Sequence, residues 1–275
     1  MNWKGFAGRL WARINDHDIF GGAAQLSYYF LLALFPLLLF LVTLLGYFAE
    51  AGSELRLNLL SYLASVMPGS AVTLVHHTLD EISDAKSGGK LSLGILAALW
   101  AASNGMGAIS TTLNAAYGVK ETRSWWKVRL ISMGLTIAVS LMIVIALALV
   151  MYGGHIGDSV AARFGFSDAF TFVWKLLQWP IALLFLMLTF NLIYYFAPDN
   201  GTRMRKWWNA GTATAILLWL LVSLGFRLYL HFFNSYSVTY GSLGALIVLM
   251  LWFYFTGLAI LIGGEINSEL EQGAK

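Results

Sequence analysis

Six long apolar stretches, each flanked by charged or turn-forming residues, constrain this chain more than any other feature of its sequence. They cover residues 24–48, 91–117, 130–152, 174–196, 210–232 and 241–263. Each stretch meets the length of about 20 residues that a helix needs to cross a bilayer. With 59% hydrophobic and 11% charged residues, the 275-residue chain has more apolar surface than one soluble core can bury. We predict an all-α, polytopic membrane protein with six transmembrane helices in a single integral membrane domain, residues 1–275.

Basic residues are concentrated in alternate connections between these stretches. Lys and Arg are frequent before the first span, between the second and third, and between the fourth and fifth: Lys4, Arg9, Arg13, Lys120, Arg123, Lys127, Arg129, Arg203, Arg205 and Lys206. Cytoplasmic loops of membrane proteins are typically rich in Lys and Arg. The pattern therefore predicts that both termini are cytoplasmic, with the N-terminus in and the C-terminus in.

Two segments outside the spans have the character of surface helices. Residues 1–20 place Trp3, Phe6 and Trp11 among basic residues, which is typical of a helix lying in the cytoplasmic membrane interface or of a helix that binds a soluble partner. Residues 49–90 predict two short amphipathic helices, a helical hairpin on the outer face. The outer ends of the spans, a second subunit or the lipid interface are all compatible covers for its apolar stripe.

The second span is the richest in polar side chains. Ser103, Gly107, Ser110 and Asn114 recur at intervals of three and four residues, and Asn104 lies beside them. Such a stripe faces protein or water, because lipid cannot satisfy polar groups. It indicates either close helix packing with hydrogen bonds between helices or the lining of a polar pathway. Asn114, together with Asn191 of the fourth span, has the larger hydrogen-bonding group that a pathway favours.

The first span begins with Gln25 and Tyr28 near its cytoplasmic end and contains Pro36 in its interior. Interfacial tyrosines are typical of the aromatic belt, whereas Gln25 needs a protein partner. Proline removes one helical hydrogen bond and kinks helices, a structural feature that also suits gating.

Charge within the predicted spans is nearly absent. Arg227 lies inside the fifth span, from where it either extends to the outer interface or binds anionic headgroups. Glu265 and Asn267 follow Gly263-Gly264 at the end of the sixth span. We expect Glu265 to pair with a cytoplasmic cation such as Arg129 or Arg205, with a role in gating as the alternative.

The sequence carries no positive signal for catalysis. It has no cysteine and none of the glycine-rich, phosphate-binding, nucleophile-elbow or HExxH motifs. His76, His77, Asp80 and Glu81 have spacing that suits a metal on one helix turn, but without further ligands we interpret them as a solvated face. We predict no catalytic residue, no metal, no cofactor and no nucleic-acid partner.

Four blocks of the sequence resemble the YihY/BrkB family. They are GAAQLSYYF at 22–30 followed by Phe35-Pro36, residues 99–118 with RSWWK at 123–127, YYFAP at 194–198, and YGSLGA at 240–245 continued by GEIN at 264–267. The resemblance implies a six-span protein of the bacterial inner membrane, a class linked to envelope integrity and often labelled as transporters. Some members carry a ribonuclease BN label, which we reject for this chain because nothing in it resembles a nuclease metal site.

Two functional hypotheses follow. The first is transport of a lipid or another amphiphile, with membrane lipids as partners and a substrate pathway of polar side chains: Gln25, Tyr28, Ser103, Asn104, Asn114, Asn191 and Arg227. The second is a scaffold that stabilises envelope machinery without transporting anything. The glycine-rich faces of the second and sixth spans are compatible with packing inside one subunit or with a homo-oligomer.

Overall fold

The computed structural model describes residues 3–48, 88–166, 168–199, 209–232 and 236–272, and within these ranges all regular structure is helical. The described helices are α1 (Trp3–Asp16), α2 (Ile19–Phe48), α5 (Gly88–Ala116), α6 (Trp125–Phe164), α7 (Asp168–Phe196), α8 (Ala210–Phe232) and α9 (Tyr236–Gln272). The predicted helical hairpin at 49–90 lies outside the described residues except for its last three positions, which begin α5. His76, His77, Asp80, Glu81 and Arg205 lie outside them as well.

Four of the helices are long and apolar enough to cross a membrane. Their apolar segments are Trp125–Val150, Ala169–Phe196, Ala210–Leu230 and Leu246–Glu271. The chain is therefore a membrane protein with several apolar helices. Helices α2 and α5 coincide in position with the first two predicted spans, and their crossing of the membrane stays a prediction.

Two helices continue well past the predicted ends of their spans. Helix α6 continues past residue 152 to Phe164, and α9 continues past Gly263-Gly264 to Gln272. The end of α6 is set by Gly165, which adopts a left-handed φ of 69° and donates its N–H to the Ala161 carbonyl. Glycine takes this conformation without the steric cost of a Cβ atom, so it is a common helix stop.

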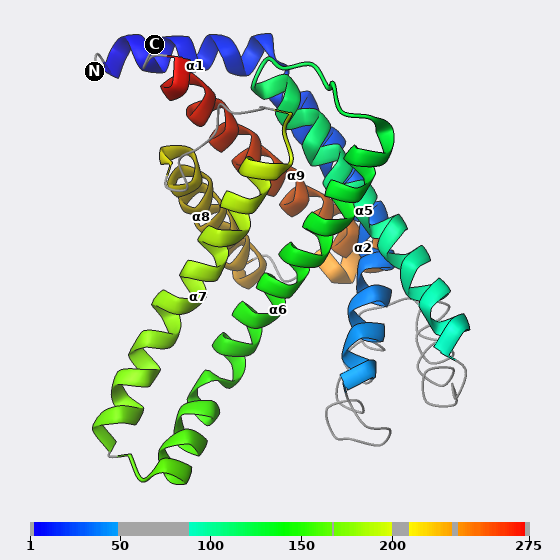
Figure 1. Ribbon diagram of the computed structural model, residues 1–275. Coiled ribbons are helices and arrows are strands. Elements are labelled where there is room, and N and C mark those ends of the chain that lie inside the picture. Colours follow the sequence, from blue (N-terminus) through cyan, green and yellow to red (C-terminus); the bar gives the residue numbers. More distant parts are fainter. Residues whose placement is uncertain (1–2, 49–87, 167, 200–208, 233–235, 273–275) are drawn as a thin grey trace.

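The helices pack in adjacent pairs, α2 with α5, α6 with α7, and α8 with α9, while α9 also packs along α2 and α5 packs on α6. Helix α1 lies across one end of this bundle, next to the last turns of α9 (Figure 1). The core is centred on α2, α5, α7 and α9. Its fully buried side chains include Leu26, Leu113, Tyr194 and Leu261.

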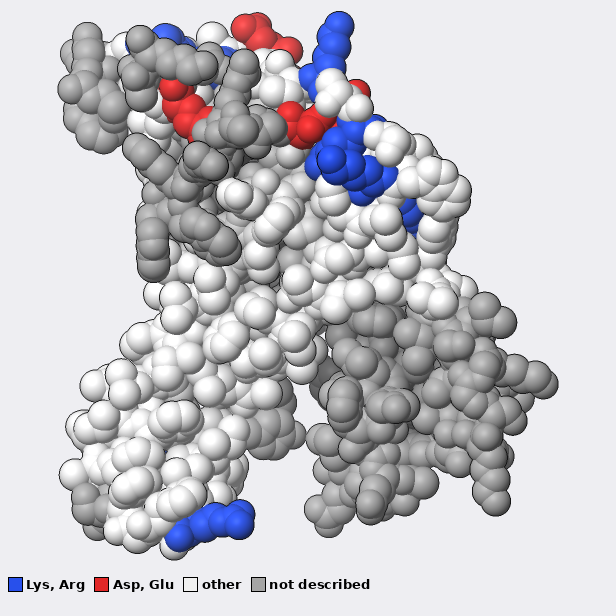
Figure 2. Space-filling model, viewed as in Figure 1, with Lys and Arg blue, Asp and Glu red and all other residues white. Residues whose placement is uncertain are grey.

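Charged side chains gather at the end of the molecule where α1 lies, which we call the charged end. It contains α1, the segments 117–124 and 197–199, and the last turns of α9. Three hydrogen bonds connect this end of the molecule: Arg13 with Ala116, Thr122 with Asp199, and Arg9 with Glu269. Figure 2 shows Lys, Arg, Asp and Glu concentrated there, and a small basic group at the opposite tip. The described surface between the two is mostly uncharged in this view, as a membrane-embedded band requires.

The distal half of the α6–α7 hairpin projects away from the charged end. Between residues 141 and 188, the buried residues that the structure describes are Gly153, Gly157, Ala161 and Gln178. Gly153 and Gly157 face Gln178 and Trp174 across the seam between the two helices, and the Trp174 indole donates to the Gly153 carbonyl at 2.6 Å. The other residues of this half-hairpin whose burial is described are half-buried or exposed. Figure 1 shows the half-hairpin leaning away from α2 and α5.

Candidate functional site

The densest polar network lies at the charged end, around the guanidinium of Arg123. Its Nε and Nη2 atoms each donate to the Glu121 carboxylate at 2.7 Å. The same guanidinium donates to the carbonyl oxygens of Phe196 at 3.2 Å and Ala197 at 2.8 Å, which end α7. Helix C-termini leave carbonyls without helical partners, and a cation there also meets the negative end of the helix dipole. Arg123 therefore fastens the α5–α6 connection to the end of α7.

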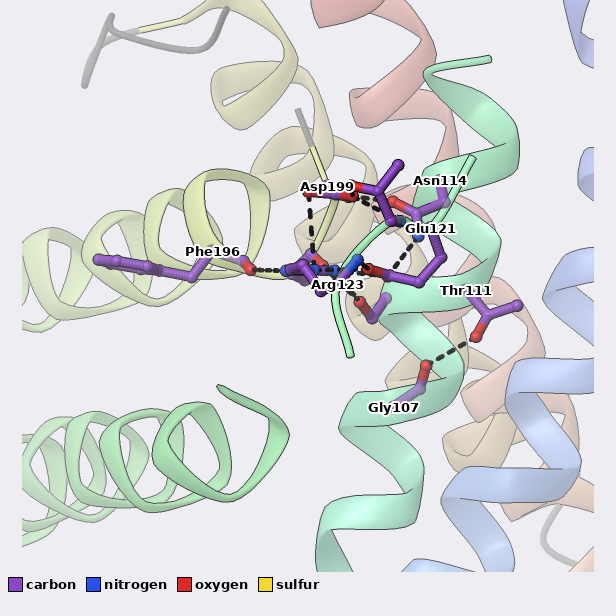
Figure 3. A network of polar contacts seen from close by, with 10 residues as sticks. Gly107, Thr111, Asn114, Glu121, Arg123, Phe196 and Asp199 are labelled. Carbon is purple, nitrogen blue, oxygen red and sulfur yellow. Dashed lines mark hydrogen bonds and ion pairs between the residues drawn. The ribbon is translucent and has the colours of Figure 1, made fainter. Parts of the chain in front are cut away.

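Asn114, at the end of α5, joins both halves of this network. Its Nδ2 donates to Glu121 at 2.9 Å, and its Oδ1 accepts from the backbone N–H of Asp199 at 2.7 Å. The Asp199 carboxylate in turn accepts from the backbone N–H and the hydroxyl of Thr122 at 2.8 and 2.6 Å. Figure 3 shows Asn114 at the end of α5 close to Glu121 and Arg123 of the α5–α6 connection and to Asp199, which follows α7. We call these four residues, with Thr122, the loop knot.

The two carboxylates of the loop knot titrate below their usual range. Hydrogen bonds from Arg123 are the main cause that lowers the pKa of Glu121. Hydrogen bonds from Thr122 are the main cause that lowers the pKa of Asp199. Each hydrogen bond favours the ionised form of its acceptor. Both carboxylates are thus held as anions at neutral pH, and the guanidinium of Arg123 balances part of their charge.

A second cluster ties α1 to α9. Glu265 has no exposed side-chain surface, accepts from Arg13 Nε at 2.8 Å, and lies 2.5 Å from His17 Nδ1. Arg13 also donates to the hydroxyl of Ser268 at 2.6 Å and to the Ala116 carbonyl at 3.1 Å. A buried charge needs a partner and further hydrogen bonds to offset the loss of hydration. Glu265 has both.

The next helical turn repeats the arrangement nearer the surface. Arg9 Nε donates to Glu269 at 2.5 Å, where the Arg9 side chain is 60% exposed and that of Glu269 is 8% exposed. We call Arg9, Arg13, His17, Glu265 and Glu269 the α1–α9 clasp. The prediction that Glu265 pairs with a cation is confirmed, but the cation is Arg13 and not Arg129, which bonds to Asn104 instead.

Sequence reasoning missed the contribution of α1 to this cluster. Basic side chains recur every four residues at Arg9 and Arg13 of α1 and at His17 directly after it, and acidic ones on α9 recur at 265 and 269. Matching four-residue intervals place each set on one helix face, so the two stripes are complementary. This complementarity of charge is the sequence feature that could have predicted the contact between α1 and α9.

Asn191 and Asn267 belong to a third polar group, between α7, α8 and α9. The Thr212 hydroxyl donates to Asn191 Oδ1 at 2.6 Å, and the Gly211 N–H donates to Asn267 Oδ1 at 2.8 Å. The buried Tyr194 hydroxyl donates to the Ile260 carbonyl at 2.8 Å. These bonds cross between helices at their closest approach, as polar side chains commonly do in membranes. Asn191 and Asn267 are thus committed to helix packing.

The polar stripe of α5 faces protein. Ser103, Ser110 and Asn114 are buried, and a Cβ on Gly107 would meet the Ser132 hydroxyl of α6 at 3.6 Å. The Ser103 hydroxyl donates to the Trp100 carbonyl of its own helix at 2.8 Å. The packing interpretation therefore accounts for the buried part of the stripe.

The other predicted residues lie apart from these clusters. Gln25 and Tyr28 are exposed on α2, Asn104 is exposed on α5, and Arg227 is exposed on α8. Pro36 is partly buried, and α2 runs through it as one helix. The predicted pathway residues are thus distributed over several faces of the described bundle. Within that bundle, no three His, Asp or Glu side chains converge as metal ligands do.

Comparison with known proteins identifies the family. A family model described as Virulence factor BrkB matches residues 10–275. The chain belongs to the BrkB family. This BrkB protein is 40% identical over 270 residues to the ribonuclease-like protein YfkH of Bacillus subtilis, across 98% of this chain and 96% of that relative.

More distant relatives are UPF0761 membrane proteins. Those of Xanthomonas oryzae and Xanthomonas campestris are 27% identical to this BrkB protein over 270 residues. The alignment covers 95% of this chain but 59% of each of these relatives, so the chain spans little more than half of their length. No solved structure matches the chain.

Proposed function

We propose that this BrkB protein moves a lipid or another amphiphile across the bacterial inner membrane and thereby contributes to envelope integrity. The observation that supports the proposal is the open distal half of the α6–α7 hairpin. An amphiphile keeps its tails in lipid while its headgroup crosses, so its path needs a side that opens to the bilayer. In this half-hairpin, the described residues that are buried lie between α6 and α7. Its outer side is therefore accessible to the bilayer.

The surface of the hairpin has the matching chemistry. Leu147 is 55% exposed, Leu176 64% and Leu183 43%, so lipid tails meet apolar side chains on both helices. Contact between this apolar surface and acyl chains breaks no hydrogen bond of a polar group. In this proposal the exposed Gln25, Tyr28, Asn104 and Arg227 contact the headgroup, and the buried Ser103, Asn114 and Asn191 hold the helices that border the path.

The proposal includes a topology. Six helices, α2 and α5 to α9, cross the membrane, with the charged end in the cytoplasm and both termini inside. The basic residues of the 117–124 segment and of α1 are then on the side that positively charged loops prefer. Helix α1 lies along the cytoplasmic interface, consistent with its aromatic and basic composition.

A flux assay tests the proposal. Purified protein in liposomes is mixed with a fluorescent phospholipid, and chemical quenching from outside reports how fast the lipid changes leaflets. We expect flux well above that of protein-free vesicles. Because the chain contains no cysteine, a Leu147→Cys variant carries one unique label site on the open face. A bulky maleimide there should slow the flux several-fold.

The matched control is Phe164→Cys at the tip of the same helix, beyond the end of its apolar segment at Val150, where the native side chain is 67% exposed. The same label at this position should leave the flux unchanged. Wild-type protein that is folded, correctly inserted and yet no faster than empty vesicles contradicts lipid transport. Equal slowing at both positions contradicts the assignment of the path to the open face.

A further inference from the structure

Arg129 is an arginine at the membrane boundary that has no carboxylate partner among the described residues. It lies in the second turn of α6, whose apolar segment begins at Trp125. Two other arginines at the charged end, Arg13 and Arg123, each bind a carboxylate. Arg129 donates to neutral oxygens instead, at Asn104 Oδ1 (2.8 Å) and at the Trp100 carbonyl. Its positive charge is therefore held in position but not neutralised.

One aromatic ring lies against this charge, and two further indoles extend from that ring. The guanidinium carbon lies 3.9 Å from the centre of the Trp100 ring, a cation–π contact. Trp100 stands 5.8 Å from Trp125, which stands 4.5 Å from Trp126, measured between ring centroids. The three indoles are 41%, 59% and 66% exposed. Tryptophan prefers the headgroup level of a bilayer, so this shelf places Arg129 beside the phosphates.

The guanidinium retains donors for a ligand. Arginine has five N–H groups in a planar fork. Two of them are used by Asn104 and Trp100. Nε is buried and has no acceptor in the described part of the chain, which leaves one N–H on each terminal nitrogen. A phosphate offers two oxygens that match such a pair of donors.

We propose that Arg129 and the Trp100, Trp125 and Trp126 shelf form a binding site for the headgroup of an anionic phospholipid. The phosphate pairs with Arg129, and the glycerol and upper acyl region lies along the indoles. The unneutralised charge selects an anionic headgroup over a zwitterionic one. This site does not depend on lipid transport, since a bound structural lipid satisfies the same chemistry.

Native mass spectrometry tests the site. The protein is released from micelles that contain equal amounts of phosphatidylglycerol and phosphatidylcholine, and the retained lipid is counted. Wild type should keep phosphatidylglycerol in preference to phosphatidylcholine. Arg129→Ala should weaken that preference about fivefold, the factor expected for one interfacial basic side chain. Arg129→Lys should retain part of it, because the charge remains while the fork is lost.

The matched control is Arg163→Ala, an exposed arginine of the same helix at the opposite end. It should bind like wild type. Trp125→Leu removes an exposed ring without touching the Arg129 hydrogen bonds, so it keeps the test valid if Arg129→Ala does not fold; it should also weaken the preference. Equal retention of both lipids by wild type overturns the proposal. Displacement of phosphatidylglycerol by millimolar inorganic phosphate overturns it too, because the site would then recognise a free anion.

Discussion

Glu265 illustrates how one buried carboxylate depends on a distant part of the chain. Its side chain has no exposed surface, and the cation that pairs with it, Arg13, comes from α1, 252 residues earlier. A carboxylate in this position is tolerated only while Arg13 neutralises it. The pair therefore makes the docking of α1 a condition for the stability of the last turns of α9.

Replacing Glu265 with Ala should lower the free energy of unfolding by roughly 3 kcal/mol, because the largely buried Arg13 loses its main counter-charge. The measurement is equilibrium unfolding in mixed detergent micelles. Arg9→Gln is the control. It removes the exposed member of the Arg9–Glu269 pair and should cost about 1 kcal/mol or less. Equal losses from the two variants would show that burial does not set the strength of the clasp.

The loop knot predicts a pH dependence. Glu121 and Asp199 have pKa values below the ordinary 4.5 and 3.8. A carboxylate with a depressed pKa in the folded state stabilises that state above its unfolded pKa, and the stabilisation is lost as pH falls through the folded pKa. Stability of the charged end should thus be constant near neutrality and fall below about pH 4.

Asp199→Asn isolates one contribution to this effect. The amide keeps an oxygen for Thr122 but cannot titrate. The unfolding midpoint of this variant should therefore fall less steeply than that of wild type between about pH 5 and pH 3, the range in which carboxylates ordinarily titrate. Parallel unfolding curves against pH for the two proteins would remove Asp199 from the explanation.

Glycine brings the backbones of α8 and α9 close to each other. A Cβ added to Gly211 would collide with the carbonyl oxygen of Gly263 and with Asn267. Backbone cannot move aside as the end of a flexible side chain does. The two helices therefore pack at a distance that only glycine permits, as small residues allow in membranes.

Gly211→Ala should accordingly destabilise the protein by about 1–3 kcal/mol, the usual range for overpacking. Gly225→Ala is the control on the same helix, since a Cβ there has nothing within 4 Å. It should be neutral or mildly stabilising, because alanine favours helix more than glycine. Unfolding in mixed micelles compares the two. Similar stabilities would indicate that α8 shifts to accept the methyl group.

The positions of the helices could be predicted because apolar runs of span length mark them directly. The end of α9 could not. Gly263-Gly264 followed by Glu265 is typical of the end of a span, yet the helix continues to Gln272. The reason is tertiary, since α1 covers Glu265 and supplies Arg13 to neutralise it. The residues next to Glu265 in the sequence do not indicate a partner so far away in the chain.

The roles of the candidate site residues could not be predicted from local sequence either. Polar residues in α5 could be recognised as facing protein or water, and Ser103 and Asn114 are buried. Their role could not be recognised, because Asn114 bonds to Glu121 and Asp199 across two connections. A polar residue that lines a path and one that joins two loops have the same local pattern. Only the arrangement of the helices distinguishes them.

At the level of the whole molecule, the proposed topology places the two ends of the bundle on opposite sides of the membrane. Single cysteines at Lys120, in the charged end, and at Phe164, at the tip of the hairpin, report on each side; both positions are exposed. In intact spheroplasts a membrane-impermeant maleimide should label Phe164→Cys and not Lys120→Cys. Lysis should make both reactive. Labelling of Lys120→Cys in unlysed cells would reverse the orientation.

The α1–α9 clasp also sets an order of events during synthesis. Arg9 leaves the ribosome 260 residues before its partner Glu269, so the clasp closes only after every helix between them has been made. Until then Arg9 and Arg13 of α1 lack the α9 carboxylates that they bind in the folded protein. Closure of the clasp therefore requires that α9 has been made, and an insertion intermediate that stalls earlier is distinguished by an undocked α1.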